Sequence, residues 1–248
     1  MPPPPPLVLS FAATDPTGGA GLQADVLTLA ALGCHPLSVA TAITVQDTHG
    51  VSRVQALDAA LVSEQAERLL SELLVAAIKI GVVASAASAS AIAALLAALP
   101  RVPVVLDPVL ASGRGDSLAD AAVLAAMRER LLPRTTVLTP NTLEARALGG
   151  VSECLARGCQ YVLVTGTHAD TPEVVNTLHG AGGIVREDRW PRLPGSYHGS
   201  GCTLASAIAA RLAHGDAVPE AVRAAQDYTW HALERGFRPA SGQYLPVR

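Results

Sequence analysis

The sequence predicts an α/β fold in which helices cover both faces of a mostly parallel β-sheet. Short runs of β-branched and aliphatic residues alternate with longer alanine-rich runs along the chain. This alternation is typical of strands that are joined by crossover helices. The run 102–107 lacks the polar and apolar alternation of a half-exposed strand, so it indicates a strand buried on both faces.

The expected elements can be read in chain order from these runs and from the turn residues between them. The expected strands are 7–11, 37–45, 77–83, 102–107, 136–139 and 161–164, followed by a hairpin of 174–178 and 183–188. The expected helices are 21–32, 61–74, 86–99, 118–132, 143–148, 202–214 and 219–235. Gly33 suits the left-handed position after the first helix. The second helix is expected to be amphipathic, with Leu61, Leu69, Leu70 and Leu73 near one face.

The chain is long and apolar enough to form one large core. It has 248 residues, and 50% of them are hydrophobic, so residues 7–248 are expected to form a single domain after a flexible proline-rich tail at 1–6. Residues 80–99 carry no charge and have the length of a membrane span. Their many alanines and serines favour a strand end, a turn and a helix instead. No basic segment precedes the apolar run 7–13, so we expect no signal peptide and a cytoplasmic location.

The charged residues and cysteines exclude several functions. A net charge of −3 and an aromatic content of 3% argue against nucleic acid or an anionic membrane as partner. The chain has one lysine, Lys79, and it does not lie in a phosphate-binding P-loop. We expect Lys79 to be a surface charge at a strand end, with a catalytic role as the alternative. The four cysteines show no zinc-ligand spacing, and structural disulfides are not expected.

Polar residues and glycines follow several predicted strands. Ligands of parallel sheets bind beyond the carboxyl ends of the strands, so these residues are candidates for a site. Asp107 ends the buried strand, where a carboxylate needs a partner such as Mg²⁺. Gln46 ends another strand and could pair with a heterocycle or lie on the surface. Asn141 and Glu144 could form a helix capping box or serve phosphate and the waters of a metal.

The segment 199–203, Gly-Ser-Gly-Cys-Thr, leads directly into an apolar helix. Free N–H groups at such a helix start bind anions, so this segment is the predicted phosphate site. Cys202 lies at the same helix start, which is expected to lower the pKa of its thiol. The alternative is a buried cysteine at a tight turn.

Five segments together resemble a known family. Residues 13–25, 41–48, 79–81, 139–145 and 198–203 are similar, in order, to the motifs of bacterial hydroxymethylpyrimidine and phosphomethylpyrimidine kinases of the ribokinase-like superfamily. The resemblance runs from about residue 7 to residue 235. It implies a ribokinase-like three-layer α/β/α sandwich with a mostly parallel central sheet, usually dimeric. It also implies phosphorylation of 4-amino-5-hydroxymethyl-2-methylpyrimidine and of its monophosphate, with ATP and Mg²⁺, in thiamine synthesis.

The resemblance also implies roles for particular residues. The substrate-binding residues would be Asp25, Gln46, Ala13, Gly21 and Val109. The catalytic anion hole would consist of Gly199, Gly201 and Cys202, with Cys202 either accepting the substrate proton or acting only through its backbone N–H. The nucleotide-binding residues would be Asn141, Glu144, Thr165, Gly166 and Gly201, and the metal ligands Asp107 and Glu144. The chain departs from the family at Ala13, where glycine is common, and at Thr165, where many members have lysine.

Two other functions remain compatible with these residues. A pyridoxal kinase of the same fold would also phosphorylate a hydroxymethyl group on a flat nitrogen ring. A non-catalytic ligand-binding module would keep the pocket without the reaction. An NAD-dependent oxidoreductase is not supported, because no Gly-x-Gly-x-x-Gly follows a strand with an acidic residue about twenty positions later. In each case the expected partner is a small molecule, with a homodimer as the expected assembly for the kinase.

Overall fold

A nine-stranded sheet forms the centre of the computed structural model, which describes residues 3–111, 118–167 and 170–248. The strands are β1 (Leu7–Thr14), β2 (His35–Gln46), β3 (Val51–Ala56), β4 (Ala77–Ile80), β5 (Val104–Leu106), β6 (Val137–Leu138), β7 (Tyr161–Val164), β8 (Glu173–Gly180) and β9 (Gly183–Pro191). Their spatial order is β3-β2-β1-β4-β5-β6-β7-β8-β9. The pairs from β2 to β7 are parallel, whereas β3, β8 and β9 join the two edges in antiparallel orientation. The predicted mostly parallel sheet is therefore confirmed.

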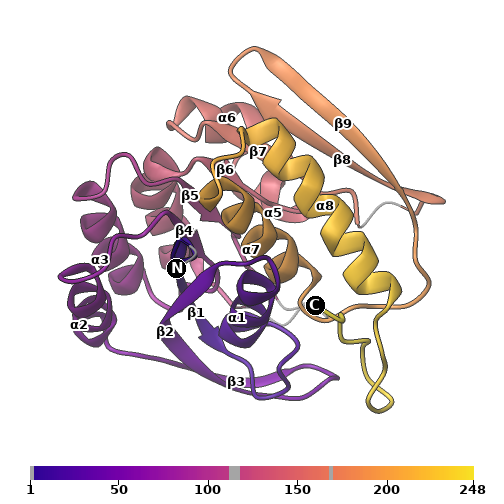
Figure 1. The fold of residues 1–248 in the computed structure, drawn as a ribbon, viewed down its shortest axis with the longest axis horizontal. Coiled ribbons are helices and arrows are strands. Elements are labelled where there is room, and N and C mark those ends of the chain that lie inside the picture. The colour runs from indigo at the N-terminus through magenta and orange to yellow at the C-terminus, as the bar shows by residue number, and fades with distance from the viewer. Residues whose placement is uncertain (1–2, 112–117, 168–169) are drawn as a thin grey trace.

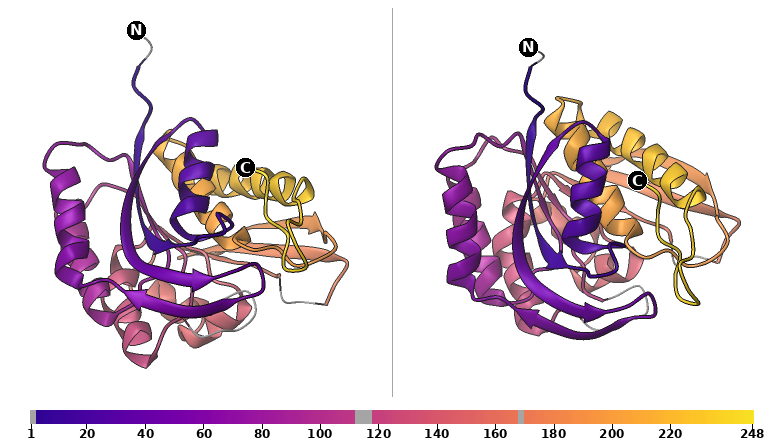
Figure 2. Two further views of the ribbon diagram at one scale, coloured as in Figure 1. Left: turned by 90° about the horizontal axis from the view of Figure 1, so that it is seen from below. Right: turned by 60° about the horizontal axis from the view of Figure 1, so that its bottom comes forward.

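Helices cover both faces of this sheet, which gives the expected three layers (Figures 1 and 2). One layer contains α1 (Gly21–Ala31), α7 (Ser200–Ala213) and α8 (Val218–Glu234), whose buried side chains share one apolar cluster with the sheet. The other layer contains α2 (Ala59–Leu70), α3 (Ala86–Ala97), α4 (Ala121–Ala126) and α6 (Val151–Ala156). The helix α5 (Thr142–Ala147) follows β6. Apolar burial on both faces stabilises the sheet and fixes where its strands end.

Most predicted elements are present, with bounds that differ by a few residues. The predicted strand 161–164 coincides with β7, and the predicted hairpin is formed by β8 and β9. Gly33 follows α1 with a φ of +75°, as its predicted C′ position requires. No helix in the described part of the chain is long and apolar enough to cross a membrane.

Two elements were not predicted, and two predicted helices have a different form. The strand β3 is an exposed edge strand with polar residues, and α6 has only six residues between glycines, so neither shows a strong apolar pattern. The predicted helix 118–132 is α4 followed by a π-helical turn (Met127–Leu131) and a 3₁₀ turn (Leu132–Arg134). The helix α2 buries Val62 and Ala66, while Leu61 is 46% exposed. Leu61 therefore lies outside the buried face of α2, whereas Leu69, Leu70 and Leu73 pack against the core.

Candidate active site

A buried polar cluster lies beneath the carboxyl ends of β1 and β4. The carboxylate of Asp25, on α1, is fully buried and forms an ion pair with Lys79, whose Nζ lies 2.9 Å from each of its oxygens. Ser10 Oγ donates to Asp25 Oδ2 at 2.5 Å, and Ser206 Oγ of α7 donates to Oδ1 at 2.8 Å. These contacts satisfy both carboxylate oxygens and tie α1 and α7 to the sheet. The carboxylate of Asp25 therefore lies inside the core. Its contact with substrate stays a prediction.

The prediction that Lys79 is a surface charge is wrong. Its side chain has no exposed area, and a Cβ on Gly81 would lie 2.6 Å from its Nζ, so the ammonium group fills the space that this glycine leaves. Burial alone would lower the pKa of Lys79, but the Asp25 carboxylate raises it above its ordinary value. The nearby Cys202 and Asp107 act in the same direction. Lys79 therefore stays charged in the core and places a positive charge behind the predicted site.

Asp107 lies at the carboxyl end of β5, next to the start of α7. Its Oδ2 is buried without a hydrogen-bond partner among the described residues. A Cβ on Gly201 would lie 3.6 Å from this oxygen, so the carboxylate faces the backbone of the predicted anion hole. Burial raises the pKa of Asp107 to about 6, although Lys79 opposes the shift. An unsatisfied buried oxygen of this kind indicates that a ligand completes the site.

Cys202 lies between this carboxylate and the first glycine-rich loop. Its thiol is buried, and it interacts with the side chain of Asp107 and the N–H of Gly21. Burial raises the pKa of Cys202 to about 12, although Lys79 lowers it. The prediction that the helix start lowers this pKa is therefore wrong. The helix dipole stabilises a thiolate less than burial destabilises it, so the thiol holds its proton at neutral pH.

Asn141 and Glu144 form the capping box that the sequence allowed. The Asn141 side chain accepts hydrogen bonds from two backbone N–H groups of α5, and Glu144 Oε2 accepts from Asn141 N at 2.9 Å. Burial raises the pKa of Glu144 to about 7, and the charge of Asp107 adds to this shift. The capping role therefore does not isolate Glu144 from the site, because the two carboxyl groups interact.

These two carboxyl groups fit a Mg²⁺ site of limited protein ligation. No group of three or more metal-ligating side chains occurs among the residues that the structure describes. Mg²⁺ commonly binds to one or two carboxylates and completes its shell with water and substrate phosphate. A cation would also offset the cost of burying these carboxylates, which raises both pKa values, and the repulsion from Asp107 that adds to the shift of Glu144.

The anion loop, residues 199–203, begins α7 and packs backbone to backbone against the loop after β1. Gly199 has a φ of +76°, and a Cβ there would lie 1.9 Å from the carbonyl oxygen of Gly19. Gly21 is equally constrained, with a φ of +57° and Ala13 O at 2.3 Å from a Cβ position. Larger residues would push the loops apart, so these glycines are required by close approach as well as by conformation.

Asp15 and His198 join the same two loops through their side chains. His198 Nε2 lies 2.8 Å from Asp15 Oδ2, and the Asp15 carboxylate also accepts the N–H groups of Thr17 and Ala20. The loop after β1 is therefore held in a fixed shape before any ligand binds.

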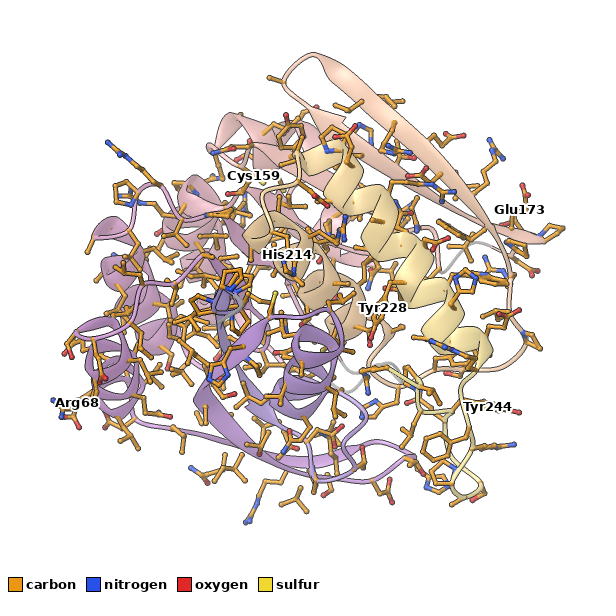
Figure 3. The ribbon with its side chains drawn as sticks, viewed as in Figure 1. Arg68, Cys159, Glu173, His214, Tyr228 and Tyr244 are labelled. Carbon is orange, nitrogen blue, oxygen red and sulfur yellow. The ribbon has the colours of Figure 1, made fainter. Side chains whose placement is uncertain are left out.

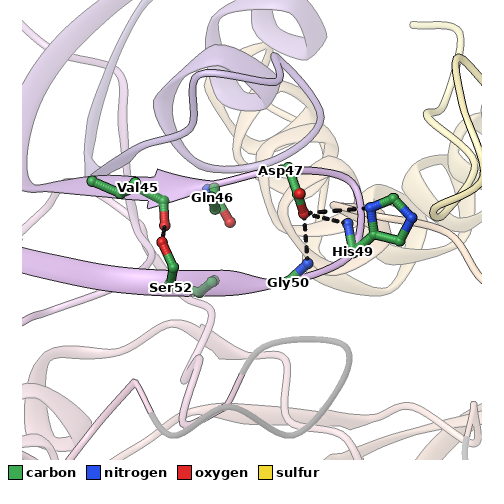
Figure 4. Close-up of a pocket in the computed structure, with 7 residues that line it drawn as sticks. Val45, Gln46, Asp47, His49, Gly50 and Ser52 are labelled. Carbon is green, nitrogen blue, oxygen red and sulfur yellow. Dashed lines mark hydrogen bonds and ion pairs between the residues drawn. The ribbon is translucent and has the colours of Figure 1, made fainter.

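Gln46 lies at the end of β2. It lines an open pocket of about 580 Å³ with residues of the turn between β2 and β3 (Figure 4). In that turn, Asp47 Oδ1 accepts the N–H groups of His49 and Gly50. Neither Asp107 nor Cys202 lines this pocket. The predicted substrate residues are thus spread over the strand ends: Ala13 is buried at the end of β1, and the N–H of Val109 donates to Asp107 O at 2.9 Å.

The predicted nucleotide residues beyond β7 lie next to Asn141. Thr165 forms an isolated parallel bridge with Asn141, and its N–H donates to Pro140 O at 2.9 Å. The N–H of Gly166 donates to the side chain of Asn176 at 3.0 Å, and a Cβ on Gly166 would lie 2.2 Å from Val175 O. Gly166 is therefore fixed by β8, and its N–H is already occupied.

A buried network extends from Gly166 to α8. Asn176 donates to Gln226 Oε1 at 2.9 Å, and Gln226 donates to Asp188 Oδ2 at 2.8 Å. Asp188 also accepts two hydrogen bonds from Arg186. Sequence reasoning missed this network, as it missed the partners of Lys79. A lone charge within the apolar run 77–83 was the signal for a buried ion pair.

Comparison with known proteins shows the family to which the chain is similar. The family model of phosphomethylpyrimidine kinase matches residues 15–248. The hydroxymethylpyrimidine/phosphomethylpyrimidine kinase of Streptomyces coelicolor is 40% identical, with 98% of this chain and 94% of that protein covered. The protein of the same name from Rhizobium meliloti is also 40% identical, with 96% and 94% covered.

Solved structures show the same fold. The phosphomethylpyrimidine kinase of Clostridium difficile 630 has a TM-score of 0.80 at 32% identity, covering 92% of this chain and 99% of that one. A Staphylococcus aureus pyridoxal kinase in complex with pyridoxal has a TM-score of 0.89 at 27% identity, with 98% and 93% covered. The family model, the full-length relatives and the fold agree with one another, and the chain belongs to the phosphomethylpyrimidine kinase family, a family of ribokinase-like phosphotransferases.

Proposed function

We propose that this chain uses ATP to phosphorylate 4-amino-5-hydroxymethyl-2-methylpyrimidine and then its monophosphate, which gives the diphosphate used in thiamine synthesis. The observation that carries the proposal is the position of Asp107, whose unpartnered Oδ2 faces Gly201 in the anion loop. A carboxylate beside a glycine-rich helix start is suited to phosphoryl transfer, where positioning and charge stabilisation supply most of the catalysis. The relatives that share this chain's full length carry the same two activities in their names.

The backbone of the anion loop would bind the phosphoryl group during its transfer. The first N–H groups of α7 have no intrahelical acceptor and point out of the helix start. Gly201 leaves the space between this backbone and Asp107 free of a side chain. Negative charge that develops on the transferred group would therefore meet fixed N–H donors.

Asp107 and Glu144 would hold Mg²⁺ through their carboxylates. When bound, the ion would neutralise phosphate charge during transfer. Asn141 orients Glu144 through the capping box, so its own contribution would be to position this carboxylate. Thr165 and Gly166 follow β7 beside Asn141, where they would form a wall of the nucleotide site, with the Thr165 hydroxyl as the polar group.

The geometry favours the backbone role for Cys202 over the role of a base. A thiol with a pKa of about 12 cannot accept a proton at neutral pH. The acceptor with a free lone pair is Asp107 Oδ2. We therefore assign to Asp107 the orientation of the attacking hydroxyl and to Cys202 a backbone N–H in the anion hole.

A turnover assay tests this function directly. The purified chain is incubated with hydroxymethylpyrimidine, ATP and Mg²⁺, and the mono- and diphosphate products are resolved by chromatography. We expect both products in sequence. The similarity to the S. aureus enzyme makes pyridoxal the alternative substrate. A higher kcat/KM for pyridoxal than for hydroxymethylpyrimidine would replace the proposal with the pyridoxal kinase alternative. Absence of transfer to either alcohol would contradict both.

Assembly and location complete the proposal. We propose a homodimer in the cytoplasm, where ATP is available. Ile43 and Val45 on β2 are 51% and 47% exposed, and apolar side chains on an exposed sheet surface favour association. Analytical ultracentrifugation would distinguish a dimer from a monomer.

A further inference from the structure

The segment after α8, residues 236–248, forms a strap along the site side of the molecule (Figures 2 and 3). We call it the C-terminal strap. Tyr244 exchanges backbone hydrogen bonds with Ser196 and His198, just before the anion loop. The N–H of Gln243 donates to Thr48 O in the turn after β2. The strap is therefore attached both to the approach of the anion loop and to the turn that contains the Gln46 pocket.

Arg248 extends from this strap into the contact between the two glycine-rich loops. Its Nε donates to Thr203 Oγ1 at 3.0 Å, on the first turn of α7. Its two terminal nitrogens donate to Gly18 O at 3.4 Å and Gly19 O at 2.5 Å. One planar guanidinium group thus joins α7 to the loop after β1.

Besides Arg248, the contact between His198 Nε2 and Asp15 Oδ2 at 2.8 Å joins these two loops. The loops meet at Gly19 and Gly199, where side chains are excluded by the close approach of the backbones. A guanidinium group presents five donors in a fixed plane and is well suited to bridge several acceptors at once. Thr203 Oγ1 also donates to Gly199 O at 2.8 Å, so the link continues into the anion loop.

The charge of Arg248 also distinguishes it from a surface arginine. Its three described hydrogen bonds go to neutral oxygens. Lys79, the only lysine of the chain, is paired with Asp25. Arg248 therefore adds a second positive charge near the anion loop, beside that of Lys79.

We propose that Arg248 is a positioning residue for phosphoryl transfer, which holds the loop after β1 against the anion loop so that the N–H donors of Gly201 and Cys202 keep their alignment with Asp107. This inference rests on the proposed function. It assigns a role in the reaction to the C-terminal strap, outside the motifs that define the family resemblance.

Kinetics of Arg248→Ala and Arg248→Lys test the proposal. A small misplacement of reacting groups costs about 10²-fold in rate, so Arg248→Ala should lower kcat by about 10–100-fold, with less than about threefold change in either KM. Arg248→Lys should retain more activity than Arg248→Ala. Guanidinium chloride at about 20 mM, far below denaturing concentrations, should restore part of the kcat of Arg248→Ala.

Arg238→Ala is the matched control. Arg238 lies on the same strap, but its hydrogen bonds go to Ser241 and Gly242 within the strap itself. This variant should keep wild-type kcat and show no response to guanidinium. An Arg248→Ala enzyme with wild-type kcat, or with a loss that guanidinium leaves unchanged, would overturn the proposal.

Hydrogen–deuterium exchange separates this proposal from the proposed function. Without any substrate, amides of residues 15–25 and 197–205 should exchange faster in Arg248→Ala than in the wild type or in Arg238→Ala. Equal exchange would overturn the positioning role. A wild-type chain that phosphorylates no pyrimidine would refute the proposed function. The exchange result would still test the positioning role of Arg248, because it needs no substrate.

A double-variant cycle covers the case in which Arg248→Ala does not fold. Arg248→Lys and Thr203→Val each weaken the same link, because Thr203 is the acceptor of Arg248 Nε. Their effects on kcat should be non-additive. Additive effects would place the two residues in separate roles and overturn the proposal.

Discussion

Replacing Lys79 with methionine tests the buried ion pair most directly. In the native chain, Nζ lies 2.9 Å from both oxygens of Asp25, and neither side chain is exposed. Lys79→Met keeps the length of the side chain but leaves the Asp25 carboxylate without its counterion. Ser10 and Ser206 still donate to this carboxylate, but two hydroxyl groups do not neutralise a buried charge.

The expected loss follows from the burial of both partners. Removing one partner of a buried pair costs about 3–5 kcal/mol in the free energy of unfolding. In a domain of this size each kcal/mol corresponds to about 2–4 °C, so the melting temperature should fall by about 6–20 °C. Thermal unfolding followed by circular dichroism gives this shift. Replacing Asp25 with asparagine in the same chain removes the unpaired charge and should recover part of the loss.

An exposed ion pair supplies the control. Arg189 contacts Glu187 at 2.6 Å, with 57% and 41% of the two side chains exposed. Arg189→Gln should therefore cost less than about 1 kcal/mol. If Lys79→Met melts within about 2 °C of the wild type, the ion pair does not stabilise the core and our account of Lys79 fails.

Three further predictions concern the site. Asp107 and Glu144, with pKa values of about 6 and 7, hold protons in the folded state that the unfolded chain releases near pH 4, so the metal-free protein should lose stability as the pH rises from about 4 to 7. Asp107→Asn should flatten this dependence of stability on pH and reduce the rise in melting temperature caused by Mg²⁺. An unchanged dependence would contradict the raised pKa of Asp107. Cys202→Ala should keep kcat within about threefold of the wild type, and native Cys202 should resist iodoacetamide at pH 8 by mass spectrometry; a loss of about 10²–10⁴-fold would restore the base role. Gln46→Ala should raise the KM of the pyrimidine about tenfold, the effect of one lost polar contact, and an equal rise in the KM of ATP would remove Gln46 from the substrate pocket.

The sheet and most of its helices could be predicted because their patterns are local. The apolar runs of β1 and β7 and the glycine after α1 act through short-range preferences, which a single sequence displays. The exposed strand β3 lacks such a pattern, because an edge strand buries too little to need one. The helix α2 shows the related limit: its leucine spacing is helical, but the packing against β2 selects Val62 and Ala66 as the buried face.

The site could be predicted only in part, for a different reason. The residues at strand ends follow from topology, so Asp107 and the anion loop were accessible from the sequence. The charge state of Cys202 depends on burial and on groups distant in the sequence, such as the charge of Lys79 and the N–H of Gly21. Likewise, the partners of Lys79 come from β1, α1 and α7. Helix starts and motifs indicate candidate chemistry, whereas the pKa of each group is set by long-range packing.

The burial of the only lysine also makes the chain a reporter of its own unfolding. A lysine-specific protease has one peptide bond to cleave, after Lys79, in β4, the strand next to the central strand β5. That bond is inaccessible while β4 stays paired with β1 and β5. Local fraying elsewhere leaves it intact, so the cleavage rate follows the opening of the sheet itself. Proteolysis in dilute solution, without any label, can therefore measure how a ligand shifts the stability of the whole core.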